Sequence, residues 1–236
     1  MAKGNIKLLI DGKRMDGRLP EQLRPIEMKV GVVGRADGSA LVKFGNTIAI
    51  AAVYGPRSLF PRYLQEAQSG ILRCRYNMAA FSVEDRKSPG LDRRSVEISK
   101  VMRLALEPAI FLEEFPKATI DVFVEILQAD GSTRVTGINA ASLALMSAGI
   151  PMKDMVTACS VGKIDGSLIL DLNGVEDNNS ESDMAFAFMP TKDKVTLLQM
   201  DGNLSQEEIK KLFKLAKDAC KKIYELQKNA IKEKYR

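Results

Sequence analysis

The feature that most limits the fold is that the hydrophobic period along the chain switches repeatedly between that of a strand and that of a helix. Residues 26–55 alternate as β-strands do, and two apolar runs flank the pair Gly45-Asn46. A two-residue connection between two such runs predicts a β-hairpin. The core is therefore expected to begin with antiparallel strands.

Helices and strands then follow one another down the chain. The period becomes helical at Arg93–Ile110 and again at 134–150, where many Gly, Ala and Ser residues imply close packing against a sheet. A final amphipathic helix is predicted from Ser205, with Glu208 completing the pattern of a capping box. Further strands are predicted at 119–128, 156–164, 167–173, 184–190 and 195–200.

The order of these elements predicts a mixed α/β (α+β) fold that forms a single domain over residues 1–236. Because 45% of the residues are hydrophobic, a chain of this length can bury a sizeable core. No run approaches eighteen consecutive apolar residues, so no membrane partner is expected.

Cysteine and histidine contents narrow the chemistry. The three cysteines lie far apart, which predicts neither a disulfide framework nor a metal site, and favours a reduced, cytoplasmic protein. The absence of histidine excludes Ser-His-Asp and Cys-His nucleophile systems and zinc held by His. Any acid–base chemistry must therefore fall to carboxylates, Lys or Tyr.

The net charge of +5 is unevenly placed. Segments 57–103 and 205–236 each contain ten Lys or Arg and five Asp or Glu, so the remainder of the chain has a net charge of −5. Two basic regions beside an acidic one suggest a bound polyanion. An ordinary solvated surface explains the same counts and stays open as the alternative.

The acidic charge is concentrated in DLNGVEDNNSESDM, residues 171–184, which contains five carboxylates and no Lys or Arg. A loop between the strands on either side could bring Asp177 and Asp183 together. Their repulsion would then keep one of them protonated, as a general acid must be. Two alternatives stay open at this point, a shared divalent metal and a polar turn without chemistry.

Asp-Gly-Ser occurs three times, and only the copy at 130–132 leads from a strand into a helix. A helix start presents unpaired backbone N–H groups and the positive end of the helix dipole. Hydroxyl groups and a forked cation in the same place suit a phosphate group, and the residues concerned are Gly131, Ser132, Thr133 and Arg134. The alternative is a capped helix start with a surface arginine.

Arg93 and Arg94 stand at another predicted helix start. Neighbours on a helix point about 100° apart, so the two side chains could bracket a phosphodiester backbone but could not easily share one carboxylate. An ion pair between Arg93 and Glu97 explains the spacing equally well. Upstream, residues 57–91 form a long, partly irregular excursion, and such excursions in compact domains are often functional.

Five segments together are similar to the RNase PH family of phosphorolytic exoribonucleases. The resemblance runs nearly end to end, and is closest to the catalytic RNase PH-like ring subunits of the archaeal exosome. It implies an RNase PH-like fold of two packed βαβα halves and a hexameric ring. The segments are RMDGRLPEQLRPI at 14–26, ADGSALVKFGNT at 36–47, SPGLDRRSVEISKVMRLALE at 88–107, EILQADGSTRV at 125–135 and LDLNGVEDNNSESDM at 170–184.

The resemblance implies a reaction in which inorganic phosphate is the co-substrate. Phosphate attacks the last phosphodiester at the 3′ end of single-stranded RNA and releases a nucleoside diphosphate. Asp177 is implied as the general acid that protonates the leaving 3′ oxygen. Asp183 is implied to assist, by positioning or through a metal such as Mg²⁺.

Roles for the basic residues are implied in the same way. The loop Gly131, Ser132, Thr133 and Arg134 would bind the attacking phosphate, Arg93 and Arg94 would grip the RNA 3′ end, and Arg62 would line the RNA path into the ring. The implied partners are a related non-catalytic RNase PH-like subunit, which completes a ring of three heterodimers, and RNA-binding cap proteins.

Two other functions stay open from the sequence. The first is a homohexameric RNase PH that trims tRNA 3′ ends and acts without a second subunit. The other is a non-catalytic, RNA-threading ring subunit, which would be expected to lack both the Asp177/Asp183 pair and the Arg93/Arg94 pair. Both pairs are present in this chain.

Overall fold

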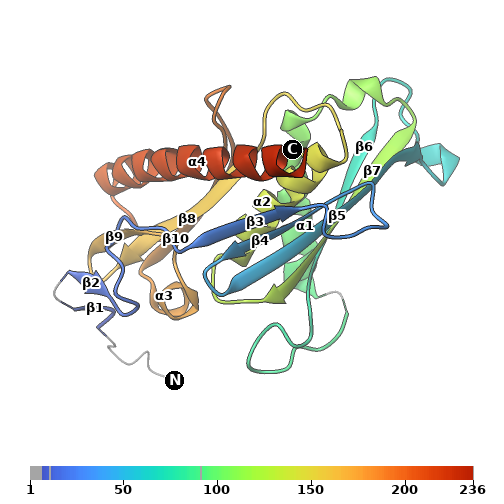
Figure 1. The fold of residues 1–236 in the computed structure, drawn as a ribbon. Helices are drawn as coiled ribbons and strands as arrows, with labels where there is room; N and C mark the ends of the chain where they lie inside the picture. Colours follow the sequence, from blue (N-terminus) through green and yellow to red (C-terminus); the bar gives the residue numbers. More distant parts are fainter. Residues whose placement is uncertain (1–6, 11, 91, 236) are drawn as a thin grey trace.

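Among the described residues, two large β-sheets form the core of the fold, and the three longer helices pack on them and between them (Figure 1). The computed structural model describes residues 7–10, 12–90 and 92–235. The helices are α1 (Arg93–Leu106), α2 (Thr133–Ser147), α3 (Gly174–Asn179) and α4 (Gln206–Lys234), and short 3₁₀ turns are η1 (Arg62–Leu64), η2 (Glu107–Ala109) and η3 (Leu112–Glu114). The strands are β1 (Leu9–Ile10), β2 (Lys13–Arg14), β3 (Ile26–Val30), β4 (Gly38–Phe44), β5 (Thr47–Ser58), β6 (Ile71–Met78), β7 (Ala118–Gln128), β8 (Thr157–Ile164), β9 (Ser167–Leu170), β10 (Ser182–Met189) and β11 (Lys194–Gly202).

The two larger sheets divide the chain into two halves. The five-stranded sheet has the order β3-β4-β5-β7-β6, and the four-stranded sheet has the order β11-β10-β8-β9. Only the β6–β7 pair is parallel among the described strands, and α1 makes the crossover between them. Each half thus runs from strands to a helix, back to strand, and ends with a helix.

Both predicted hairpins are confirmed. Phe44 pairs with Thr47 and Ile164 pairs with Ser167, so each connection contains two residues. Gly45 adopts φ of +55° in the first connection, a left-handed conformation that glycine tolerates without steric cost.

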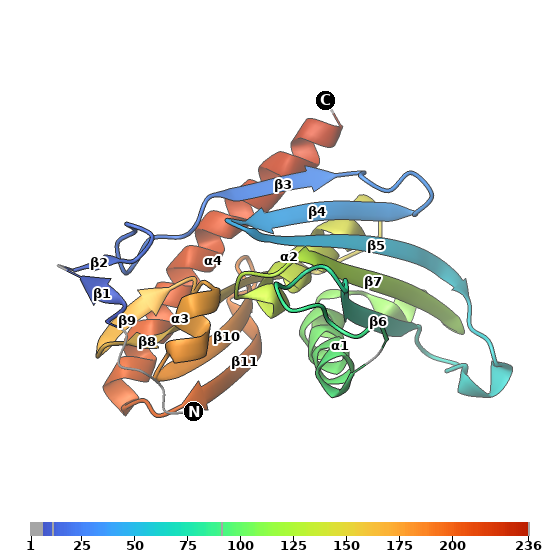
Figure 2. The ribbon, with the colours of Figure 1, turned by 90° about the horizontal axis from the view of Figure 1, so that it is seen from below.

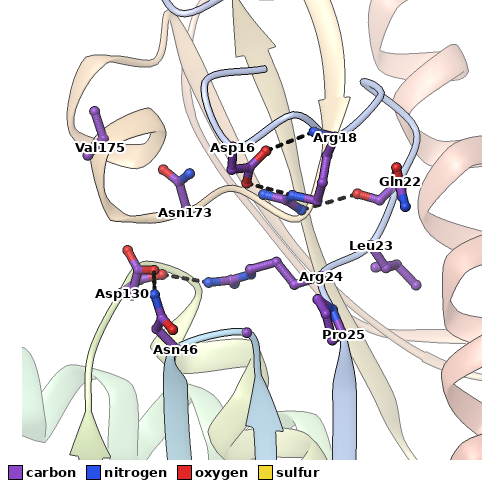
Figure 3. A pocket seen from close by; sticks show the side chains of 11 residues that line it. Asp16, Arg18, Gln22, Leu23, Arg24, Pro25, Asn46, Asp130, Asn173 and Val175 are labelled. Atoms are coloured by element: carbon purple, nitrogen blue, oxygen red, sulfur yellow. Dashed lines mark hydrogen bonds and ion pairs between the residues drawn. The ribbon is translucent and has the colours of Figure 1, made fainter. Parts of the chain in front are cut away.

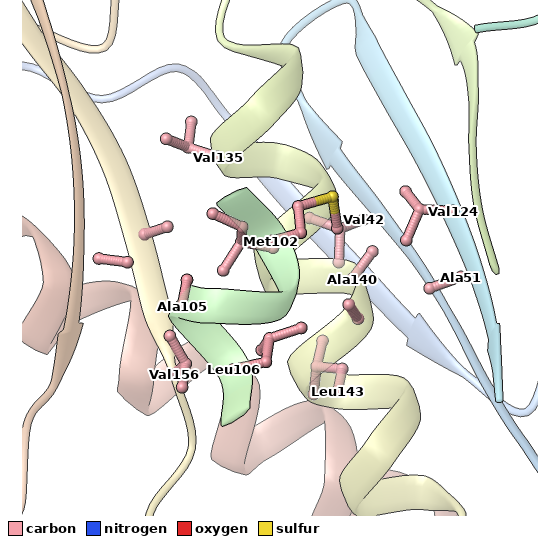
Figure 4. Packing of buried hydrophobic residues seen from close by; sticks show 14 of the residues in the cluster. Val42, Ala51, Met102, Ala105, Leu106, Val124, Val135, Ala140, Leu143 and Val156 are labelled. Atoms are coloured by element: carbon pink, nitrogen blue, oxygen red, sulfur yellow. The ribbon is translucent and has the colours of Figure 1, made fainter. Parts of the chain in front are cut away.

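Helix α2 lies at the centre of the molecule and is almost entirely buried. It packs against β4, β5 and β7 on one side and against β8 of the other sheet. Figure 4 shows Met102 of α1 and Ala140 of α2 among apolar side chains of the five-stranded sheet. The small residues predicted to allow close packing do so, because a Cβ on Gly137 would lie 3.2 Å from Val124.

The C-terminal helix joins the two halves. Ser205 caps α4, and Glu208 completes the predicted capping box. The buried stripe of α4 packs on β8, β9 and β10 and also on β3 of the other sheet (Figures 1 and 2). Within the residues that the structure describes, no helix is long and apolar enough to cross a membrane.

Some features predicted from the sequence were wrong, including the end of α2, which was predicted at Ile150 and lies at Ser147. The helix predicted to reach Ile110 ends at Leu106, because Pro108 supplies no N–H to continue the helical hydrogen bonds, and the chain goes on as the 3₁₀ turn η2. The strand predicted over 167–173 ends at Leu170. The expected loop after it contains α3, whose start is capped by Asn173.

Candidate active site

The start of α2 is shaped by a tight approach to the acidic segment. Gly131 has φ of +69°, and a Cβ at this position would lie 2.5 Å from the carbonyl carbon of Asn173. Ser132 follows in the left-handed conformation, with φ of 56°. Glycine is therefore required at position 131, because any side chain would collide with Asn173, the residue that caps α3.

The Ser132 side chain also holds the chain together. Its hydroxyl lies 2.7 Å from the carbonyl oxygen of Leu172, to which it donates, and 2.6 Å from the hydroxyl of Ser160. Because this hydroxyl already has protein partners, the groups best able to receive a ligand are the first N–H groups of α2, with Thr133 and Arg134.

Three of the five carboxylates in the acidic segment have structural partners. Asp171 pairs with Arg24 at 2.7 Å, and Glu176 pairs with Arg14. Glu181 lies 3.3 Å from Lys163 and accepts a hydrogen bond from the Gly166 amide at 2.7 Å.

The remaining two carboxylates, Asp177 and Asp183, line one cavity together with the start of α2. Asp177 comes from α3 and Asp183 from β10, and both are half-buried. The cavity has a volume of about 60 Å³ and is lined by Arg94, Ser132, Thr133, Arg134, Val135, Ser160, Asp177, Asp183 and Ala185. A single water requires about 10–15 Å³ by this measure, so the cavity suits a group of a few atoms rather than a nucleotide.

Burial and repulsion act on both carboxylates. Burial, followed by the charge of Asp183, raises the pKa of Asp177, while Arg94, Arg134 and Arg24 oppose that shift. Burial raises the pKa of Asp183 as well, against the opposing charge of Arg134. Each therefore keeps its proton to a higher pH than a free Asp, which is what a general acid requires.

The arginines of the site differ in how they are placed. Arg94 lines the cavity from the start of α1, whereas its neighbour Arg93 is not among the lining residues. Among the described side chains, the suggested Arg93–Glu97 ion pair does not form, and Glu97 accepts a hydrogen bond from Gln199 at 3.2 Å. The Nε of Arg134 is buried and lacks a hydrogen-bond partner within the described part of the chain.

Arg62 lies far from this cavity in the same chain. It is exposed on η1, in the turn that projects beyond β5, at the opposite end of the five-stranded sheet from α3 (Figures 1 and 2). Phe60 and Tyr63 beside it are 79% and 84% exposed. The structure therefore does not bring Arg62 together with the other predicted site residues.

A larger cavity, about 660 Å³, lies between the N-terminal segment and the loop that precedes α2 (Figure 3). Its charged side chains are already paired, since Arg18 donates to Asp16 at 2.7 Å and Arg24 donates to the Asp130 carbonyl oxygen at 2.6 Å. The smaller cavity is the better candidate site, because its carboxylates, Asp177 and Asp183, have no cation partner within 4 Å among the described residues. Arg18 Nη2 in the larger cavity also lacks a hydrogen bond, but it lies 3.8 Å from Glu176 Oε2.

Sequence reasoning missed the residues that support the site. Ser160 lines the cavity from β8, and nothing in its local sequence marks it. Arg14, Arg18 and Arg24 belong to the motif at 14–26, but their buried partners lie about 150 residues away. Asp130 directly precedes the predicted phosphate loop, and its carboxylate accepts a hydrogen bond from Gly174 N at 2.9 Å.

The chain is similar to known proteins along most of its length. Residues 22–151 match domain 1, and residues 154–219 match domain 2, of the RNase PH 3′ exoribonuclease family. The chain is 61% identical over 210 residues to the protein named exosome complex component Rrp41 of Pyrococcus furiosus, covering 88% of this chain and 84% of that one. It is 53% identical over 225 residues to the protein of the same name in Methanopyrus kandleri, covering 95% and 94%.

A solved structure supports the same fold. The crystal structure of rice (Oryza sativa) Rrp46 superposes with a TM-score of 0.81 at 27% identity, covering 91% of this chain and 98% of that one. The family match, the identity to its members and the shared fold lead to one conclusion: this chain belongs to the RNase PH family of 3′ exoribonucleases.

Proposed function

We propose that this chain is the catalytic ring subunit of an exosome and degrades RNA from its 3′ end by phosphorolysis. The observation that carries the proposal is the convergence of Asp177, Asp183 and Arg94 on the start of α2 around one small cavity. Relatives named exosome complex component Rrp41 match over most of this chain, which supports the exosome as its assembly.

The start of α2 would hold the attacking phosphate. Its free N–H groups and the positive end of the helix dipole favour an anion, and Arg134 offers an unpartnered Nε beside them. The hydroxyl of Thr133 is a better phosphate ligand than that of Ser132, because the Ser132 hydroxyl already donates to the carbonyl oxygen of Leu172.

Arg94 would neutralise the scissile phosphodiester, and Asp177 would supply the proton. A phosphate oxygen forms a bond to the phosphorus of the last nucleotide, and the bond from phosphorus to the 3′ oxygen of the preceding nucleotide breaks. Asp177, whose pKa is raised by burial and by the charge of Asp183, gives its proton to that leaving oxygen. The products are a nucleoside diphosphate and an RNA with a free 3′ hydroxyl.

Catalysis of this kind depends on positioning and electrostatics, and needs no covalent nucleophile. That fits a chain without histidine. Because the reaction is reversible, excess nucleoside diphosphate should extend RNA 3′ tails.

Asp183 is the residue through which Mg²⁺ would assist the reaction. Among the described residues, no cluster of three or more potential metal ligands occurs, and two carboxylates alone offer fewer oxygens than Mg²⁺ needs. Phosphate oxygens of the substrates could supply the rest, with Asp183 as the protein ligand. A rate that rises with Mg²⁺ in the wild type but not in Asp183→Asn would place the ion at that residue.

The partners are part of the proposal. A related RNase PH-like subunit would complete a ring of three heterodimers, RNA-binding cap proteins would sit on it, and the whole assembly would be cytoplasmic. Arg62, flanked by exposed Phe60 and Tyr63, would contact the single-stranded RNA path, because bases stack on aromatic side chains while a cation attracts the backbone.

The test is labelled single-stranded RNA incubated with the assembled ring, with and without inorganic phosphate. We expect phosphate-dependent shortening from the 3′ end and release of nucleoside diphosphates. Equal degradation without phosphate, yielding monophosphates, would rule out phosphorolysis. Activity of the chain alone as a homohexamer would favour the RNase PH alternative, and an inactive ring that still binds RNA would favour the non-catalytic one.

A further inference from the structure

Three arginines of the N-terminal segment, Arg14, Arg18 and Arg24, are buried against the acidic segment. Each is at most 8% exposed, although Arg is among the residues most rarely buried in proteins. None of the three lines the cavity proposed for phosphate. Their burial therefore calls for a role other than direct contact with that ligand.

Arg14 clamps the end of β9 to α3. Its Nε donates to Glu176 Oε1 at 2.7 Å, and its Nη2 pairs with Glu176 Oε2. The guanidinium also donates to the carbonyl oxygen of Leu170 at 2.6 Å and to that of Asp171 at 2.7 Å. One planar group thus fixes both the strand end and the helix that follows it.

Helix α3 depends on such support, because a helix of six residues is too short to be stable by itself. Glu176 Oε2 also accepts from the Asn173 amide at 2.9 Å, which completes the capping box. Glu176 is buried, and the next residue is Asp177, whose side chain points about 100° away around the helix. The grip on Glu176 therefore sets the direction of Asp177 toward the cavity.

Arg24 ties the same segment to the loop before α2. It pairs with Asp171 at 2.7 Å and donates to the Asp130 carbonyl oxygen at 2.6 Å (Figure 3). The Asp130 carboxylate in turn accepts from the first residue of α3, Gly174, at 2.9 Å. The two sides of the cavity, α3 and the start of α2, are thus held to one another through these contacts.

The energetics favour a positioning role over a stabilising one. The free energy needed to remove two charges from water offsets much of their mutual attraction. A protein with apolar residues of similar volume in place of a buried ion pair is therefore often equally stable. We propose that Arg14 and Glu176 are positioning residues that orient Asp177 for proton transfer through α3. This inference rests on the proposed function, since it concerns the placement of its general acid.

The experiment uses the assembled ring and begins with the wild type. Phosphate-independent or absent RNA degradation by the wild type would contradict the proposed function itself. With an active wild type, Glu176→Gln keeps the shape of the side chain and removes its charge. We expect its single-turnover rate to fall about 10²-fold, as small misplacements of catalytic groups do, with RNA affinity within about two-fold of wild type.

Glu181→Gln is the matched control, since it neutralises a partly exposed carboxylate of the same segment that pairs with Lys163. Its rate should stay within about two-fold of wild type. The double variant Arg14→Met/Glu176→Met is expected to fold, because an apolar pair can replace a buried ion pair, yet to remain about as slow as Glu176→Gln.

Three results would overturn the inference. The first is a Glu176→Gln rate within about two-fold of wild type. The second is full activity of the double variant, which would mean that packing alone suffices. The third is a parallel loss of rate, RNA affinity and thermal stability in Glu176→Gln, which would make the pair structural only.

Discussion

At the scale of single residues, the acidic segment separates into two classes that its sequence does not distinguish. Asp171, Glu176 and Glu181 are bound by cations, whereas Asp177 and Asp183 face a cavity. The difference arises from partners far away in the chain. Burial raises the pKa of both Asp177 and Asp183, so each keeps its proton to a higher pH than a free Asp.

Asp177→Asn should remove catalysis while RNA affinity and ring assembly stay intact. The amide keeps the size and polarity of the side chain but cannot donate a proton as a carboxylic acid does. Loss of a positioned general acid typically costs about 10²- to 10⁴-fold in rate. Single-turnover phosphorolysis, with RNA affinity measured separately, checks this. A rate above about half of wild type would mean that another group protonates the leaving oxygen.

Asp183→Asn should move the alkaline limb of the pH–rate profile to lower pH. Asp177 acts in its protonated form, so the rate falls as pH rises through its pKa, which burial and the charge of Asp183 raise. Without that negative charge, ionised Asp177 is less disfavoured and its pKa drops. Wild type and variant are compared in the same phosphate buffers, so that the titration of phosphate itself cancels. An unmoved limb would show that Asp183 does not act on Asp177 electrostatically.

At the scale of elements, α1 shows how helix geometry selects among neighbouring residues. Arg93 and Arg94 are adjacent in sequence and begin the same helix, yet only Arg94 lines the cavity. Adjacent helical side chains point about 100° apart, so when Arg94 faces the cavity, Arg93 points away from it. The sequence predicts the same role for both arginines, whereas the helix directs only Arg94 into the cavity.

Arg94→Ala should weaken RNA binding more than Arg93→Ala does, although both remove one positive charge from the same helix start. Losing one phosphate contact lowers the slope of log affinity against log salt concentration by about one. RNA binding measured over a range of salt concentrations, in a catalytically inactive background, compares the two variants. Equal losses would mean that RNA contacts both arginines from outside the cavity.

At the scale of the whole molecule, a buried polar network joins the two halves. Asn139 of α2 donates to the Ala158 carbonyl oxygen of β8 at 2.7 Å and accepts from its amide at 3.1 Å. Gln227 of α4 donates to Asn139 at 3.1 Å. Asn139 and Gln227 are fully buried. Their side chains lose hydrogen bonds to water on folding, and hydrogen bonds across the interface between the halves replace them.

Asn139→Ala should lower the free energy of unfolding by about 1–3 kcal/mol for each buried group left without a partner. Thermal unfolding should still show one cooperative transition if residues 1–236 behave as the single domain that the sequence predicts. Asn203→Ala, at an exposed position, is the control. Two separated transitions in the wild type would instead mean that the halves unfold independently.

The sequence by itself determined the elements and the chemistry available to them. Hydrophobic period, turn residues and capping boxes are local properties, so both hairpins and the start of α4 could be predicted from neighbouring residues. The tertiary structure alone decided which polar residues meet. The pairing of Arg14 with Glu176 and the exclusion of Arg93 from the cavity both depend on it. The physical reason is that burial and charge pairing act between residues distant in sequence, and no local pattern records them.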